Sequence, residues 1–209
     1  MSTPLRILGD KGSGNCLKVL WTAQRLSIPF AWEDVDVTSD RSDKRRTRSA
    51  EFLAKNPFGE IPVVILSDGS TLAQSNGIMR YLARGSSLLP DDAYTQAKID
   101  EWLFWEQYSH EPYIAVCRFQ MKYLGKPAHE REPWRVAKGE AALDLLEHAL
   151  ARQPFLVGET LTIADIALVA YTRWAHEGGF SLATRPHLRA WIARCEDALG
   201  ISADQSAAA

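Results

Sequence analysis

The sequence pattern changes part-way along the chain. Over residues 1–84, short runs typical of β-strands alternate with segments of helical spacing, whereas residues 91–200 show helical spacing throughout. Strands that alternate with helices pack as one sheet covered by helices, and helices that follow one another pack on themselves. We therefore predict an α/β domain over residues 1–84 and an all-α domain over residues 91–200.

The expected elements of the first domain follow the order β-α-β-α-β-β-α. The turn Asp68-Gly69-Ser70 joins the last two strands as a hairpin. The predicted strands span residues 5–9, 30–37, 61–66 and 71–73, and the predicted helices span residues 13–27, 49–55 and 75–83.

The second domain contains no strand signal of comparable strength. Pro112 lies inside its first predicted helix and should bend it, because proline has no N–H to donate and clashes with the preceding turn. Thr162 and Asp165 form a capping box before a fully apolar helix, a structural motif to which we assign no chemistry. The predicted helices span residues 93–123, 133–151, 162–174 and 186–199.

Charge, cysteine content and hydropathy narrow the class of protein. A net charge of -2 gives no attraction to nucleic acid or to a membrane surface, and the charged stretch at residues 40–49 is interpreted as solvated surface. Three cysteines without CxxC spacing indicate neither a disulfide framework nor a metal site. The sequence lacks both the apolar core of a signal peptide and the roughly 20 apolar residues of a membrane helix. We expect a cytoplasmic protein with no metal, no nucleic-acid partner and no membrane partner.

The segment Ser13-Gly14-Asn15-Cys16 stands where a predicted strand gives way to a helix, and it has two interpretations. Ser13 either caps the helix or donates its hydroxyl hydrogen to a ligand thiolate, with Asn15 as a second donor. A free thiol has a pKa near 8.5, so a donor and a helix N-terminus would favour its ionised, nucleophilic form. Cys16 is likewise either a small core residue or a low-pKa thiolate.

Two further short segments, Ile61-Pro62 and Gln74-Ser75, each have a structural and a ligand-binding interpretation. Pro62, at the start of a predicted strand, is either an ordinary edge proline or a cis-proline that turns the Ile61 backbone outward to pair with an extended peptide. Ser75, where a strand ends and a helix begins, is either an N-cap or part of a carboxylate site. In the second case the Gln74 amide oxygen would accept from an ammonium group.

Four segments together resemble a soluble glutathione S-transferase, and the resemblance covers nearly the whole chain. Each segment alone is weak evidence for the family, but the order and spacing of the four together are specific for it. The family has a thioredoxin-like N-terminal domain and an all-helical C-terminal domain, which agrees with the predicted boundary. The segments are SGNCLKV (13–19), NPFGEIPVV (56–64), AQSNGIMRYLA (73–83) and FLVGETLTIADI (155–166).

The resemblance implies a role for each matching residue in binding glutathione. Ser13 matches the serine that donates to the glutathione sulfur in theta-, delta- and zeta-like classes. The Ile61-Pro62 step matches the cis-proline segment, whose backbone pairs with the cysteinyl part. The Gln74-Ser75 pair matches the residues that hold the γ-glutamyl end, and Lys55 stands where a basic residue reaches the glycyl carboxylate.

Members of the family use a tyrosine, a serine or a cysteine at the glutathione sulfur, and the residues present narrow this choice. The chain has no tyrosine before Tyr81, which excludes the family's tyrosine type. Cysteine-type members place a catalytic cysteine at this same helix start, where Cys16 lies. We favour Ser13 over Cys16, because Ser13 comes first and matches the serine-type position.

The helix at residues 104–119 resembles the one that walls the electrophile pocket in bacterial members. For every residue of this set, ordinary helix–helix packing is the alternative. The pocket candidates are Trp105, Tyr108, Tyr113 and Trp174.

The resemblance implies a glutathione transferase that uses glutathione as cosubstrate and joins its thiolate to small, largely apolar electrophiles. It also implies a homodimer. Two alternatives differ in chemistry: a glutathione-dependent disulfide reductase or thiol transferase, in which Cys16 or bound glutathione performs the exchange, and a glutathione-binding protein without catalysis.

Overall fold

The computed structural model describes residues 4–35 and 46–201. The chain divides into two compact units, Met1–Ser86 and Ser87–Ala209, and the division falls inside the segment 84–91. Part of the predicted strand at 30–37 and most of the charged stretch at 40–49 lie outside the described residues. Among the described helices, none is long and apolar enough to cross a membrane.

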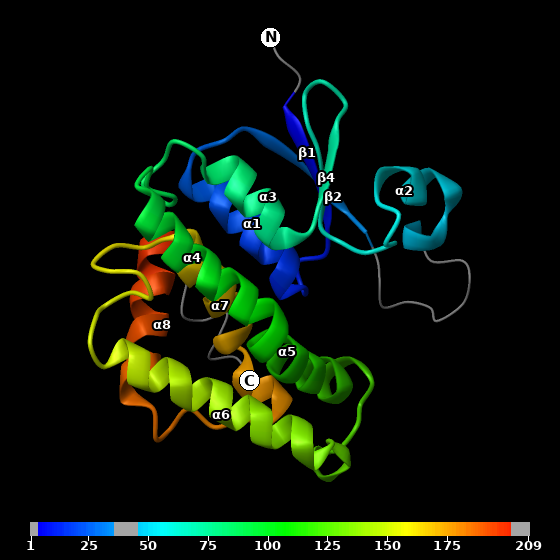
Figure 1. Cartoon of the computed structure of the whole chain (residues 1–209). Coiled ribbons are helices and arrows are strands. Elements are labelled where there is room, and N and C mark those ends of the chain that lie inside the picture. Colours follow the sequence, from blue (N-terminus) through cyan, green and yellow to red (C-terminus); the bar gives the residue numbers. More distant parts are fainter. Residues whose placement is uncertain (1–3, 36–45, 202–209) are drawn as a thin grey trace. The chain divides into compact units, whose positions relative to one another are not determined.

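The first unit is built on a four-stranded mixed sheet with the strand order β2-β1-β3-β4 (Figure 1). β1 runs parallel to β2 and antiparallel to β3, which in turn pairs antiparallel with β4. The predicted strand at 61–66 is shorter in the structure, because Pro62 cannot donate to the ladder. The strands are β1 (Leu5–Gly9), β2 (Phe30–Asp34), β3 (Val63–Ile65) and β4 (Thr71–Ala73).

Three helices cover the two faces of this sheet. α1 (Gly14–Arg25) and α3 (Ser75–Ala83) lie side by side, and α2 (Ala50–Lys55) follows a short 3-10 turn at Arg46–Arg48 (Figure 1). The element order is the one that the sequence predicts, and Ser49 caps α2 by accepting from the Phe52 N–H.

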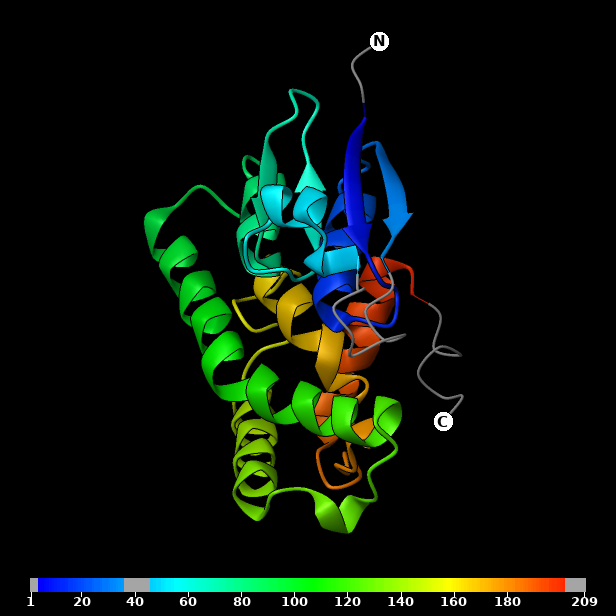
Figure 2. The same ribbon diagram turned by 90° about the vertical axis from the view of Figure 1, so that its right-hand side faces the viewer.

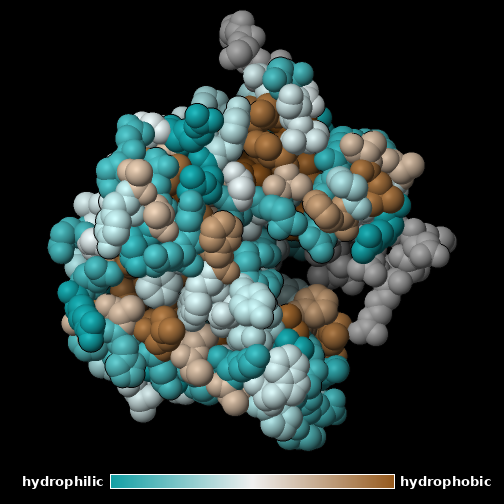
Figure 3. All heavy atoms as spheres, viewed as in Figure 1, coloured by the Kyte–Doolittle hydropathy of each residue, from teal (hydrophilic) through white to brown (hydrophobic). Residues whose placement is uncertain are grey.

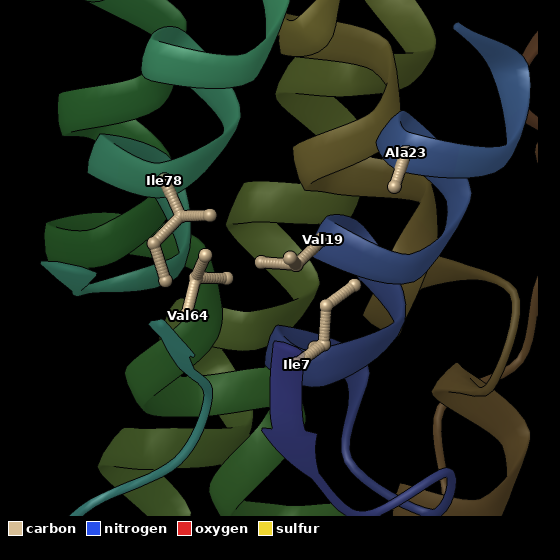
Figure 4. Packing of buried hydrophobic residues seen from close by; sticks show 5 residues of the cluster. All are labelled: Ile7, Val19, Ala23, Val64 and Ile78. Atoms are coloured by element: carbon tan, nitrogen blue, oxygen red, sulfur yellow. The ribbon is translucent and has the colours of Figure 1, made fainter. Parts of the chain in front are cut away.

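Alternation along the strands divides the core of the first unit into two layers. Ile7 and Val64 pack with Val19, Ala23 and Ile78 of α1 and α3, and Figure 4 shows these side chains gathered between the sheet and the two helices. Their strand neighbours point to the other face, because successive side chains alternate. The second layer consists of Leu8, Val35, Phe52 and Val63.

The described part of the second unit consists of helices joined by loops, with an isolated β-bridge between Phe155 and Gly158. The predicted helix at 93–123 is helical over its whole length, but two π-helical turns interrupt it, and Figure 2 shows its axis changing direction between α4 and α5. Pro112, at the start of α5, follows the first π turn, in keeping with the predicted bend. The elements are α4 (Ala93–Trp105), π turn η2 (Glu106–His110), α5 (Glu111–Arg118), π turn η3 (Phe119–Tyr123), α6 (Pro133–Leu150), α7 (Ile163–Thr172), α8 (Pro186–Leu199) and 3-10 turns at Ala128–Glu130 and Ala175–Gly178.

α7 is the core of this unit, since all of its residues are buried and it contacts α4, α5 and α8. The predicted capping box is present. Asp165 accepts from the Thr162 N–H at 2.9 Å, and its other oxygen accepts from the Leu156 N–H at 2.8 Å and from the Trp191 ring N–H at 2.9 Å. Asp165 therefore holds a loop and α8 to the start of α7, which is a structural role.

Candidate active site

Strand register brings three of the predicted motifs to one end of the first unit's sheet. Leu8 pairs with Val63, and Val63 pairs with Ala73. The turn that follows β1, the Pro62 step before β3 and the Gln74 step after β4 are therefore neighbours. The N-termini of α1 and α3 begin at this same end.

Ser13 occupies the N-cap position of α1, but its side chain makes no capping hydrogen bond. Its backbone oxygen accepts from the N–H groups of Cys16 and Leu17 at 3.1 and 3.0 Å. The Ser13 side chain is half-buried, and it acts to lower the pKa of the Cys16 thiol, which lies three residues further along α1. The simple capping interpretation of this side chain is thus not what the structure shows.

Cys16 is a core residue in the structure. Its side chain is fully buried, and a Cβ on Gly9 would lie 3.1 Å from its sulfur and 2.9 Å from the Trp32 ring. Burial raises the pKa of the thiol to about 11, and hydrogen bonds from the Asp10 backbone and Ser13 only partly oppose this. The interpretation of Cys16 as a low-pKa thiolate is therefore wrong, because desolvation outweighs the helix N-terminus.

Asn15 joins the two helix starts. Its Oδ1 accepts from Lys18 Nζ at 2.8 Å and from Ser75 Oγ at 3.3 Å. Lys18 is fully buried in α1. Sequence reasoning missed this lysine, although a cationic residue inside an apolar helical run, three positions after Asn15, was a usable signal.

The Gln74-Ser75 step differs in detail from its prediction. Gln74, not Ser75, occupies the N-cap position of α3, and it makes no side-chain capping bond. Its φ of 67° lies in a region that L-residues rarely adopt and that costs about 1–3 kcal/mol. Ser75 is the first residue of the helix and is buried, whereas the Gln74 side chain is exposed. The strained backbone thus presents the Gln74 amide to solvent beside the N–H groups of the first turn of α3.

The Ile61-Pro62 peptide bond is cis. β3 lies between β1 and β4, so Pro62 immediately precedes an internal strand and is not an edge proline. Buried Asn56 shapes the preceding loop, since it donates to the Glu60 carbonyl at 2.7 Å and accepts from the Phe58 N–H at 3.1 Å. Within the described part of the chain, no backbone hydrogen bond uses Ile61.

Lys55 already has a partner at the end of α2. Its Nζ lies 2.8 Å from Glu51 Oε1 and also donates to the Glu51 carbonyl at 3.2 Å. An exposed ion pair of this kind contributes at most about 1 kcal/mol. These two bonds leave the ammonium group a third donor. A role for Lys55 at a ligand carboxylate stays a prediction.

Two pockets open at opposite ends of the first unit. One of about 210 Å³ is lined by Gly9, Asp10, Asp34 and Val35, beside the turn that leads to Ser13. The other, of about 590 Å³, lies where β1 begins and where α1, β3 and α3 end, and its lining includes Leu5, Ile28, Leu66 and Leu82. Figure 3 shows hydrophobic residues gathered on the surface of this unit, beside α3. The larger pocket contains none of the predicted site residues.

The four aromatic candidates of the second unit do not gather into one wall. Tyr108 is 82% exposed, whereas Trp174 is buried with the Arg118 guanidinium 4.0 Å from its ring centroid. Trp105 packs edge-on against Trp102, and Tyr113 packs edge-on against Trp134. For Trp174 and Tyr113 the structure thus shows packing against a side chain of another element, the alternative interpretation. The contact between Trp105 and Trp102 lies within α4, so a pocket role for Trp105 stays a prediction.

Comparison with known proteins agrees with this arrangement. The family model "Glutathione S-transferase, N-terminal domain" matches residues 12–84, and "Glutathione S-transferase, C-terminal domain" matches residues 121–198. Glutathione S-transferase 3 of Zea mays is 32% identical over 203 residues, which are 90% of this chain and 87% of that relative. The chain belongs to the glutathione S-transferase family.

Solved structures of glutathione S-transferases match almost the whole fold. The crystal structure from Pseudomonas fluorescens Pf-5 has a TM-score of 0.87 and 44% identity, covering 93% of this chain and 95% of that one. The crystal structure from Xanthobacter autotrophicus Py2 has a TM-score of 0.85 and 44% identity, covering 92% of each chain. The predicted fold, family and enzyme class are confirmed: the protein is a glutathione transferase with a thioredoxin-like N-terminal domain and an all-α C-terminal domain. The serine type stays a prediction that rests on Ser13.

Proposed function

We propose that this glutathione transferase binds glutathione where α1 and α3 begin, and that the Ser13 hydroxyl donates a hydrogen bond to the glutathione sulfur. The observation that carries the proposal is the Ser13 side chain, which stands at a helix N-terminus without capping it. A hydroxyl that does not cap the helix can donate to a ligand thiolate, and a hydrogen bond to a charged acceptor is stronger than one to a neutral group.

The chemistry requires the thiolate, because the neutral thiol is a poor nucleophile. Ser13 and the positive end of the α1 dipole stabilise the sulfur's negative charge and so lower the pKa of bound glutathione. The thiolate then attacks a small, largely apolar electrophile. A carbon–sulfur bond forms, and the electron pair leaves with the departing group or stays on the substrate until a proton arrives.

The rest of glutathione extends along the same end of the sheet. The Ile61 backbone, placed by the cis bond, pairs with the cysteinyl part as an added strand would. The N–H groups at the start of α3 bind the γ-glutamyl carboxylate, while the exposed Gln74 amide oxygen accepts from the ammonium group. Lys55 is the candidate for the glycyl carboxylate.

A thiol-transferase route through Cys16 has no structural support, because its sulfur is buried and its pKa is raised. The three cysteines are free and buried, which fits a reducing compartment such as the cytoplasm. For the homodimer, Tyr94 and Phe104 of α4 supply large exposed apolar side chains of the kind that subunit contacts cover.

Replacing Ser13 by alanine tests the proposal. We expect Ser13→Ala to lower kcat with a chlorodinitrobenzene as the electrophile by about 100-fold or more, as loss of one oxyanion donor does. Glutathione affinity and the unfolding midpoint should change little. Ser67→Ala is the matched control, because this exposed serine lies at the other end of the sheet. An unchanged kcat in Ser13→Ala would remove this residue from the mechanism.

A further inference from the structure

Lys18 is a lysine in a fully buried position, where charged side chains are rare. α1 is otherwise mostly apolar around it in sequence, with Leu17 and Val19 also buried. Removing an ammonium group from water costs several kcal/mol unless hydrogen bonds or opposite charges compensate. A partner is therefore expected, and one is the Oδ1 atom of Asn15, at 2.8 Å from Lys18 Nζ.

This contact fixes which way the Asn15 amide faces. A lysine ammonium has hydrogen-bond donors and no acceptor, so only the amide oxygen can lie against it. Ser75 Oγ donates to the same oxygen at 3.3 Å. The two N–H bonds of Asn15 Nδ2 therefore face away from Lys18, and no hydrogen bond between described residues uses them.

The position of Asn15 suits an anionic ligand. It is the second residue of α1, and its partner Ser75 is the first residue of α3, so two helix N-termini meet here. Each carries a partial positive charge of about half an elementary charge. The Lys18 charge also reaches this turn, since it acts to lower the pKa of Cys16, although burial outweighs it.

We propose that Lys18 is a positioning residue for the γ-glutamyl carboxylate of glutathione. It holds the Asn15 amide so that an Nδ2 N–H donates to that carboxylate beside Ser75. The inference rests on the proposed glutathione site and adds two residues to its γ-glutamyl end. It assigns Asn15 to the carboxylate and not to the sulfur.

The test compares two ligands, glutathione and 4-aminobutyryl-cysteinyl-glycine, which lacks only the γ-glutamyl carboxylate. Affinities are measured by calorimetry for the wild type and for Lys18→Met, Asn15→Ala and Lys18→Met/Asn15→Ala. We expect each single variant to bind glutathione about 10-fold or more weakly, as for a lost hydrogen bond to a charged group. The affinity of each variant for the analogue should fall by less than about threefold. The double variant should be no weaker than either single variant, because both act through one contact.

A second variant covers the case in which Lys18→Met does not fold. Asn15→Asp keeps an oxygen toward Lys18 and Ser75 but has no N–H to donate, so it should lose affinity for glutathione and not for the analogue. In turnover, these variants should raise KM for glutathione at nearly constant kcat, opposite to Ser13→Ala. Lys98→Met, at an exposed lysine of α4, is the matched control.

The outcomes separate this inference from the proposed function. If the wild type binds and conjugates glutathione but Lys18→Met and Asn15→Asp bind both ligands as tightly as the wild type, the positioning role is wrong. Equal losses for both ligands also overturn it, because they indicate a general structural effect. A wild type that does not bind glutathione overturns the proposed function, and this inference with it.

Discussion

At the residue scale, Ser13 and Cys16 show what decides a side chain's chemistry. They lie three positions apart at one helix start, and either could serve as the sulfur-handling group of a transferase. The structure separates them by burial alone: Ser13 is half-buried at the N-cap, and Cys16 is fully buried beside Gly9. Sequence spacing does not contain this difference, because it depends on the strand that lies beneath the helix.

The burial of the cysteines predicts their reactivity. Burial raises the pKa of all three thiols, to about 11 for Cys16, so the protonated form dominates at pH 8. We expect a disulfide reagent to titrate almost none of the three thiols in the native protein at pH 8 and all three in denaturant. Rapid native reaction that is lost in Cys16→Ala would contradict the core assignment.

The same raised pKa predicts a dependence of stability on pH. The folded state holds the Cys16 proton more tightly than the unfolded chain, so this residue's contribution is complete below about pH 9 and is lost as pH rises toward about 11. The free energy of unfolding of Cys16→Ala should therefore approach that of the wild type over this interval. Urea titrations of both proteins across this pH interval measure the difference between their free energies of unfolding. A difference that does not change with pH would argue against a raised pKa of Cys16.

At the element scale, most boundaries follow from sequence and the departures have local causes. β3 begins after Pro62 because that residue cannot join the ladder. The N-cap of α3 is Gln74 and not Ser75, which a propensity argument misses because Gln74 adopts a positive φ that its residue type disfavours. The π turns beside α5 depend on tertiary packing, which helical periodicity does not reveal.

Two helical glycines give a matched prediction at this scale. In an open helix, glycine to alanine stabilises by up to about 1 kcal/mol. A Cβ on Gly77 of α3 would meet no atom within 4 Å, whereas a Cβ on Gly139 of α6 would lie 2.6 Å from the Phe180 ring. Gly77→Ala should therefore stabilise and Gly139→Ala should destabilise, as measured by urea unfolding. A gain in both variants would show that α6 and Phe180 pack less closely than described.

At the scale of the whole molecule, the change from alternating elements to helices alone was sufficient to predict the fold class. The strand pairing then brings the segments around Ser13, Pro62 and Gln74 to one end of the sheet. From the sequence alone, this proximity was implied only by the resemblance to a known family. The electrophile pocket was not predictable in the same way. Aromatic composition suggests a pocket wall, but Tyr113 packs against Trp134 of α6 and Trp174 packs against Arg118 of α5. Trp105 packs against Trp102 of its own helix.

The proposed function requires the N-terminal unit to bind glutathione and to make its thiol more acidic. The most direct measurement is the ultraviolet absorbance of the thiolate of protein-bound glutathione, titrated across pH. We predict a pKa well below the value of about 8.5 for a free thiol, because Ser13 and the α1 N-terminus favour the charged form. Tight binding with an unshifted pKa would contradict the account and leave a glutathione-binding protein that does not activate its ligand.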